Sequence, residues 1–283
     1  MCPMIESYSC KWLSKPSADL VSWFQASFDA AWQARSIIKQ DPERSVSVVE
    51  ALGEKLLVKA FPYSIKQRMI ETLGLSRSLK VSHARNKRII QEGASIPESR
   101  GVVVVDSPSA GRLLLHCFTY IADSQNLHNA IIDRGERGIS YQNSLLQQAV
   151  TQLVYLHRAK RFHGDAKLTN MLVHNGSVLL VDIDGRQISR PRSKWLRDLA
   201  RFLVGVAELH VDKPLIMDIV DDYSRQMERE GFAIDRQFQL DVIQRAIILA
   251  RRHAEKYQRD CILLNSDPAD FVKETDIHSG RAS

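Results

Sequence analysis

The chain has 283 residues, which is enough to bury one large core or two lobes packed together. Its hydrophobic content of 44% and charged content of 25% are typical of a soluble globular protein, and the net charge of +6 is compatible with an anionic ligand, a phospholipid surface or nucleic acid. No apolar run approaches the roughly 20 residues that span a bilayer. The four cysteines form no CxxC pair, which favours free thiols over a metal site, and the polar stretch from Met1 to Lys15 predicts no secretory signal; we therefore expect a cytoplasmic protein.

The first part of the chain combines two helices with several strands. Apolar residues recur at helical spacing from Ser17 to Arg35, and Ser17 is placed to cap that helix. A second helix is predicted from Ser78 to Gln91, where Gly93 would end it. The predicted strands are Ile37–Ile38, Val46–Val49 and Leu56–Phe61, which resemble an antiparallel meander, and then Val102–Val105 and Leu113–Phe118.

The pattern changes after about Ile121, where helices come to dominate. Residues 141–157 form a long amphipathic pattern, residues 171–181 a short hairpin with an Asn-Gly turn, and residues 195–264 are mostly helical. This order predicts an α+β fold with a small antiparallel-sheet lobe followed by a helical lobe. We expect an N-terminal helical extension at 1–35, a first lobe at 36–121 and a second lobe at 122–283.

A run of polar residues lies between the long helix and the hairpin, in the sequence His163-Gly164-Asp165-Ala166-Lys167-Leu168-Thr169-Asn170. The second hairpin strand then ends in Val181-Asp182-Ile183-Asp184. Phosphoryl transfer needs a carboxylate near the attacking hydroxyl, carboxylate and amide oxygens on Mg²⁺, and cations on the phosphates. Asp165 is the candidate base, Lys167 can reach the transferring phosphate, and Asn170 and Asp182 are candidate metal ligands.

Loop residues of these types often make only turns and caps. The ordered combination of HxDxKxxN, a hairpin and an acidic strand end instead favours the catalytic pattern of kinases. Asp182 follows the apolar strand directly, so we prefer it to Asp184 as the ligand; Asp184 could be a second ligand or a partner of Arg186.

Three further residues have predicted roles outside this run. Lys59, in the third strand, would point at the α- and β-phosphates of a nucleotide. His163 is expected to brace the loop rather than take part in the chemistry. Asp198 could be a surface charge or a carboxylate that accepts backbone hydrogen bonds from the catalytic loop.

From about residue 36 to 205 the sequence resembles the bacterial lipopolysaccharide-core kinases, the Kdo/heptose kinase or InaA-like family of the protein-kinase-like superfamily. The stretches that carry the resemblance are Ile38-Lys39-Gln40, Ser45-Val46, Leu57-Val58-Lys59, Ser82 to Gly93 with Ile96-Pro97, the catalytic loop, Val181 to Arg186, and Trp195 with Leu199 and Arg201. The resemblance implies phosphorylation of an inner-core sugar hydroxyl by ATP and Mg²⁺ at the cytoplasmic face of the inner membrane. At matching positions it implies Asp165 as base, Asn170 and Asp182 as metal ligands, and Lys59 on the nucleotide.

The sequence departs from the kinase pattern in three places. No glycine lies between Gln40 and Ser45, so backbone amides or Ser45 would have to cover the phosphates. No glutamate lies in the middle of the 78–91 helix to pair with Lys59, and Glu71 and Glu92 are poor candidates. The last eighty or so residues match no motif.

Other interpretations stay open. A small-molecule phosphotransferase of the aminoglycoside or choline type also uses an HGD loop, Lys167 resembles Ser/Thr protein kinases, and a pseudokinase would bind without turnover. The absence of an APE motif after Asp182 argues against an ordinary protein kinase. The basic helix at 246–256 could rest on anionic lipid at the inner membrane or pack as an ordinary helix. We expect a glycan acceptor and no nucleic-acid partner.

Overall fold

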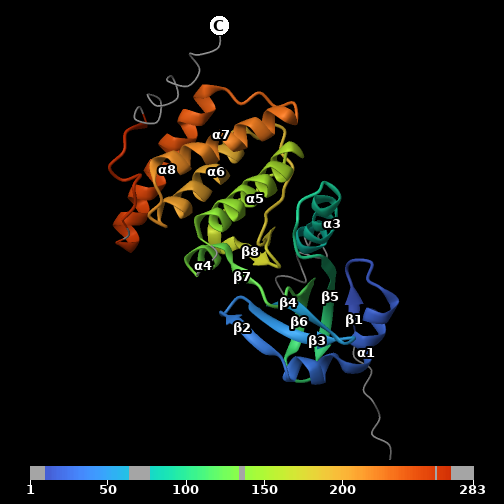
Figure 1. Cartoon of the computed structure of the whole chain (residues 1–283). Helices are drawn as coiled ribbons and strands as arrows, with labels where there is room; N and C mark the ends of the chain where they lie inside the picture. The colour runs from blue at the N-terminus through green and yellow to red at the C-terminus, as the bar shows by residue number, and fades with distance from the viewer. Residues whose placement is uncertain (1–9, 64–76, 134–137, 259, 269–283) are drawn as a thin grey trace, which may run out of the picture. The chain divides into compact units, whose positions relative to one another are not determined.

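The computed structural model describes residues 10–63, 77–133, 138–258 and 260–268. The chain divides into two compact units (Figure 1). One holds the chain up to Ile90 together with Pro97–Ala122, and the other holds Gln91–Ile96 and the chain from Asp123 onward. Cys10, Cys117 and Cys261 are free thiols, as expected, and Cys2 lies outside the described residues.

The first unit is built on a six-stranded antiparallel sheet in the order β1-β5-β6-β4-β3-β2. Its strands are β1 (Cys10–Trp12), β2 (Ser36–Gln40), β3 (Ser45–Ala51), β4 (Glu54–Pro62), β5 (Ser99–Ser107) and β6 (Gly111–Thr119). The predicted meander is confirmed as β2-β3-β4. Strand β1 was not predicted; it adds an edge strand next to β5.

Helix α1 (Ala18–Gln33) covers one face of this sheet. Ser17 caps the helix by accepting a hydrogen bond from the amide of Leu20, as predicted. The buried α1 residues Leu20, Phe24, Phe28 and Trp32 form one core with alternate residues of β3 to β6. Asp29 adds a polar contact, because its carboxylate accepts hydrogen bonds from Ser107 and Ser109 at the turn between β5 and β6.

The other face of the sheet carries Lys59. Its neighbours Val58 and Ala60 belong to the core under α1, so Lys59 points to the opposite side of β4. Lys59 is directly opposite His116 of β6, which shares that face. Helix α3 (Arg77–Gln91) is tied to this region through His83, whose Nδ1 lies 2.7 Å from Ser99 Oγ, which in turn lies 2.8 Å from His116 Nε2.

The second unit is mainly helical. Its helices are α4 (Leu127–Ile132), α5 (Gly138–Arg158), α6 (Arg192–Ala207), α7 (Lys213–Arg229) and α8 (Arg236–Tyr257), and its small sheet is β7 (Gln125–Asn126), β8 (Met171–His174) and β9 (Ser177–Leu180). Asn175 and Gly176 both have positive φ, as the tight turn between β8 and β9 requires. This hairpin and the long helix before it confirm the predicted order of elements.

Helix α8 shows how the basic C-terminal segment packs. Its apolar residues Phe238, Val242, Ile243, Ala246, Ile247 and Ala250 are buried. Arg251 and Arg252 are exposed. These positions fit the interpretation of this segment as an ordinary packed helix with a charged outer face. Within the described ranges no helix is both long and apolar enough to span a membrane.

Candidate active site

The loop that begins at His163 is fixed to helix α6 by a buried carboxylate. Asp198 accepts hydrogen bonds from the backbone amides of His163 (2.5 Å) and Gly164 (2.9 Å), so the second of its two predicted roles is confirmed. Gly164 has a φ of +93°, and a Cβ there would lie 3.2 Å from the Cβ of Asp184. A glycine is therefore required where the chain turns toward Asp165.

Two histidines support this arrangement. His163 is buried, and its Nδ1 accepts a long hydrogen bond from the amide of Asp165 (3.4 Å), which fits its expected bracing role. His157 lies 3.3 Å from Asp198 through Nε2 and 2.7 Å from the hydroxyl of Tyr223 through Nδ1. Burial lowers the pKa of His157, although Asp198 opposes the shift, and burial raises the pKa of Tyr223. A neutral His157 that donates to Asp198 and accepts from Tyr223 satisfies all three groups.

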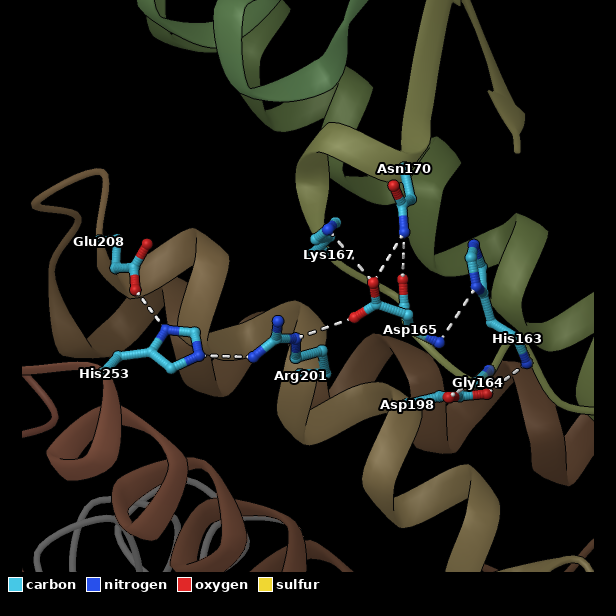
Figure 2. Close-up of polar contacts among 9 residues, drawn as sticks. All are labelled: His163, Gly164, Asp165, Lys167, Asn170, Asp198, Arg201, Glu208 and His253. Atoms are coloured by element: carbon cyan, nitrogen blue, oxygen red, sulfur yellow. Dashed lines mark hydrogen bonds and ion pairs between the residues drawn. The ribbon is translucent and has the colours of Figure 1, made fainter. Parts of the chain in front are cut away.

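The side chains of Lys167, Asn170 and Arg201 contact the carboxylate of Asp165 (Figure 2). Its Oδ2 accepts a hydrogen bond from Asn170 Nδ2 (3.0 Å) and lies 3.2 Å from Lys167 Nζ. Its Oδ1 lies 3.2 Å from Arg201 Nε, on helix α6. The structure thus brings together Asp165, Lys167 and Asn170, and it adds Arg201.

These neighbours set the charge of Asp165. Partial burial on its own raises the pKa of the Asp165 carboxyl. The hydrogen bonds and charges of Lys167 and Arg201 lower it by more, so the net pKa is below its usual value. The carboxylate is therefore ionised at neutral pH. An ionised carboxylate that is 45% exposed can accept a hydrogen bond from an incoming hydroxyl.

Asn170 and Asp182 have the chemistry expected of Mg²⁺ ligands. The Nδ2 of Asn170 donates to the backbone carbonyl and the carboxylate of Asp165, which leaves Oδ1 for a metal. The backbone amide of Val181 donates to the Asn170 carbonyl (3.0 Å), so the next residue in the sequence, Asp182, lies near Asn170. Asp182 is exposed and has a φ of +57°, an uncommon backbone conformation for a residue with a side chain and one that occurs often at functional sites. Amide and carboxylate oxygens are the ligands that Mg²⁺ takes from proteins, so these residues fit the metal.

Asp184 has a different environment from Asp182. Both of its carboxylate oxygens accept hydrogen bonds from Arg186, each at 2.7 Å. Its backbone amide donates to the His163 carbonyl (2.8 Å), which joins this segment to the loop that begins at His163. Of the two roles considered for Asp184, pairing with Arg186 is the one that the structure shows.

The proposed nucleotide-binding residues lie in the first unit. Lys59 is on β4, and its Nζ lies 5.5 Å from the centre of the Phe118 ring. Ser45 begins β3, and its hydroxyl lies 3.1 Å from that of Ser47. The glycine-free loop before it is closed by Asp41, whose carboxylate accepts hydrogen bonds from the amides of residues 43 and 44.

The structure also bears on the missing glutamate partner of Lys59. Glu92, which belongs to the second unit, forms a bidentate ion pair with Arg161 of the same unit, with N–O distances of 2.6 and 2.9 Å. Glu71 lies outside the described residues. Helix α3 instead contributes His83, which contacts Ser99, and Ser99 in turn contacts His116.

Sequence reasoning missed the residues behind Arg201. Its Nη1 contacts His253 Nε2 (2.5 Å) on α8, and His253 Nδ1 contacts Glu208 Oε1 (2.8 Å) at the end of α6. Arg201 comes three residues after Asp198 on one helix, a spacing that places both on the same side. No comparable signal links His253 or Glu208 to the loop, because their contacts depend on how α8 packs against α6.

No family model matches the sequence, and no curated protein matches it. Among solved structures, the chain is similar to WaaP in complex with acyl carrier protein, with a TM-score of 0.57 and 15% identity over 88% of this chain and 98% of that one. A glucosamine kinase matches with a TM-score of 0.47 and 11% identity over 87% of this chain and 92% of that one. The PAN3 pseudokinase of Neurospora crassa matches with a TM-score of 0.42 and 11% identity over 87% of this chain and 68% of that one. The protein-kinase-like α+β fold is confirmed, and the expected resemblance to the lipopolysaccharide-core kinases holds as a likeness of fold.

Proposed function

We propose that this chain is an ATP- and Mg²⁺-dependent kinase that phosphorylates a sugar hydroxyl, Kdo or heptose, of the lipopolysaccharide inner core. The observation that supports catalysis most is the arrangement around Asp165. Its carboxylate is ionised and partly exposed, it is held by the amide of Asn170, and it lies beside Lys167. The choice of acceptor rests on the sequence resemblance over residues 36–205.

In the proposed reaction the acceptor oxygen forms a bond to the γ-phosphorus of ATP while the bond from that phosphorus to the β-γ bridging oxygen breaks. Asp165 orients the acceptor hydroxyl and takes its proton. Lys167, 42% exposed, is able to turn from Asp165 to the transferring phosphoryl group. Asn170 and Asp182 would hold Mg²⁺, which neutralises charge on the phosphates, and Lys59 and Ser45 would bind the nucleotide.

We also propose where the reaction occurs and how the chain is divided. The lobes would be 36–121 and 122–283, with 1–35 as an extension of the first. A lipid-linked acceptor would place the protein at the cytoplasmic face of the inner membrane, where exposed cations such as Arg251 and Arg252 would favour anionic lipid. Sedimentation with anionic liposomes at low and high salt tests this contact, and binding that does not depend on salt or is absent would count against it.

The acceptor is tested by transfer of labelled γ-phosphate from ATP to a panel of acceptors. The panel contains phosphatase-treated inner-core lipopolysaccharide, kanamycin, choline and a mixed protein substrate. We expect label on the lipopolysaccharide, and phosphate analysis of core oligosaccharide from a deletion strain should show one phosphate fewer. Label on the small molecules or the protein would instead support those alternatives. ATP binding without transfer to any acceptor would support a pseudokinase.

A further inference from the structure

A continuous chain of polar contacts leads away from the candidate base (Figure 2). Asp165 Oδ1 is contacted by Arg201 Nε at 3.2 Å, and the other side of the same guanidinium contacts His253 Nε2. His253 then contacts Glu208 through Nδ1 at 2.8 Å. The side chains of Arg201, His253 and Glu208 are 26%, 19% and 10% exposed, so the chain becomes less exposed as it leaves the loop.

The chemistry of these groups permits only one assignment of protons. A guanidinium has donors and no acceptor, and it stays protonated in proteins. His253 Nε2 must therefore accept the hydrogen bond from Arg201, which means that the proton of a neutral imidazole is on Nδ1. That Nδ1–H donates to the carboxylate of Glu208. Each of the three contacts between Asp165 and Glu208 then pairs a donor with an acceptor.

The two oxygens of Asp165 are held in different ways. Lys167 and Asn170 contact Oδ2, and both have a second role in the proposed reaction, on the phosphate and on the metal. Arg201 contacts Oδ1 and is less exposed than Lys167. Arg201 is thus the cation that can remain on Asp165 when Lys167 turns to the phosphate.

We infer that Arg201 is a positioning residue for Asp165 and that His253 and Glu208 position Arg201. This inference rests on the proposed kinase function. A free arginine side chain loses rotamer entropy when it is fixed. The contacts with His253 and Glu208 restrict the guanidinium in advance, so that the carboxylate of Asp165 presents Oδ2 to the acceptor hydroxyl in one orientation.

The first test compares Arg201→Gln with Arg197→Gln, which removes the same charge from an exposed position one turn earlier on α6. Transfer is measured with ATP and phosphatase-treated inner-core lipopolysaccharide. We expect Arg201→Gln to lower kcat by about 100-fold, the cost of a small misplacement of a catalytic group, and to leave KM for ATP within about twofold. Arg201→Lys, which cannot contact both partners, should lose about tenfold. Arg197→Gln should match the wild type, and a wild-type kcat in Arg201→Gln would overturn the inference.

The second test separates positioning from general stability. His253→Gln keeps an acceptor and a donor, whereas His253→Phe keeps neither, so we expect kcat near the wild-type value for the first and about tenfold lower for the second. Glu208→Gln should lower kcat as His253→Phe does. Its control Glu255→Gln, at an exposed position of α8, should keep the wild-type kcat. Equal kcat values for the Gln and Phe variants of His253, with equal melting temperatures, would contradict the inference.

A third measurement does not depend on turnover. Nitrogen-15 NMR of the histidine rings, with the His253 signals assigned by their loss in His253→Gln, reports which ring nitrogen carries the proton. We expect a neutral ring protonated at Nδ1 at neutral pH. A ring protonated at Nε2 would overturn the inference even if the enzyme is active. An inactive wild type with the expected tautomer would refute the proposed function and leave the polar chain in place.

Discussion

The residues of the loop that begins at His163 are held in place by buried groups. Asp198 is 1% exposed and meets the amides of His163 and Gly164 as well as the imidazole of His157. A buried carboxylate is stable only when such partners replace its water. The partners of Asp198 thus compensate for its burial and fix the backbone just before Asp165.

We predict that Asp198→Asn weakens both stability and transfer. An amide has one acceptor oxygen and would direct an N–H at a donor of the loop, so the free energy of unfolding should fall by roughly 3 kcal/mol or more. Urea unfolding measures this loss. Asp212→Asn, at an exposed helix cap, serves as the control and should lose only about 0.5 kcal/mol. Equal losses in the two variants would contradict the role given to Asp198.

A second prediction at this scale concerns the metal. Asp182→Asn keeps a residue that tolerates positive φ but removes the charge of the proposed ligand. We therefore expect the Mg²⁺ concentration for half-maximal transfer to rise by about 100-fold or more, because the loss of a group that only supports a metal ligand already costs up to about 100-fold. Asp184→Asn, which disturbs the pairing with Arg186, should change it much less. The reverse order, in a titration of transfer rate against Mg²⁺, would move the ligand role to Asp184.

At the scale of elements, helix α1 completes the core of the first unit. Phe24, Phe28 and Trp32 stack along the helix, with ring centres 5.1 and 5.6 Å apart, and Trp12 of β1 meets Phe24 edge-on. The helix therefore supplies much of the apolar surface that buries one face of the sheet. Residues 18–33 are part of the fold of this unit.

We predict that Phe28→Ala destabilises the protein by about 3–5 kcal/mol, because Phe28 is fully buried and its removal leaves a cavity. Gln25→Ala, on the exposed side of the same helix, should change the free energy of unfolding by less than about 0.5 kcal/mol. Chemical denaturation followed by tryptophan fluorescence measures both. A small effect of Phe28→Ala would show that α1 is not part of the core.

The elements also show which features a sequence can reveal. Helices α1, α3 and α5 and strands β2 to β6 carry their own periodicity and were predicted. Strand β1, strand β7 and helix α4 are too short for a periodic pattern, and β1 is defined by pairing with β5, some ninety residues away. The loop residues Asp165, Lys167 and Asn170 could be predicted because they are contiguous. Arg201 was indicated only by its spacing from Asp198 on one helix. His157, Glu208 and His253 could not be predicted, because only the packing of the helices brings them to the site.

At the scale of the whole molecule, buried histidines link stability to pH. Burial lowers the pKa of His83, His116, His157 and His163, and it lowers the pKa of His116 to about 3. A lowered pKa in the folded state means that the unfolded chain binds more protons as the pH falls from about 6.5. The folded state therefore loses stability through that range, down to the pKa of the folded form.

We predict that the free energy of unfolding decreases by a few kcal/mol between about pH 6.5 and pH 4, as expected for several buried neutral histidines. His116→Gln keeps a polar side chain next to Ser99 and removes one of these titrations, so the decrease in its free energy of unfolding should be smaller. Urea unfolding at a series of pH values measures both slopes. A stability that is constant from pH 6.5 to pH 4 in the wild type would contradict this account.

The central claim is that this fold transfers the γ-phosphoryl group of ATP with Asp165 as base. The most direct measurement is the rate of transfer to phosphatase-treated inner-core lipopolysaccharide by the wild type and by Asp165→Asn, with the ATP affinity of each measured separately. We predict transfer by the wild type, a loss of about 10³-fold in the variant, and ATP affinities within about twofold of each other. Transfer at the same rate by both proteins would contradict the claim.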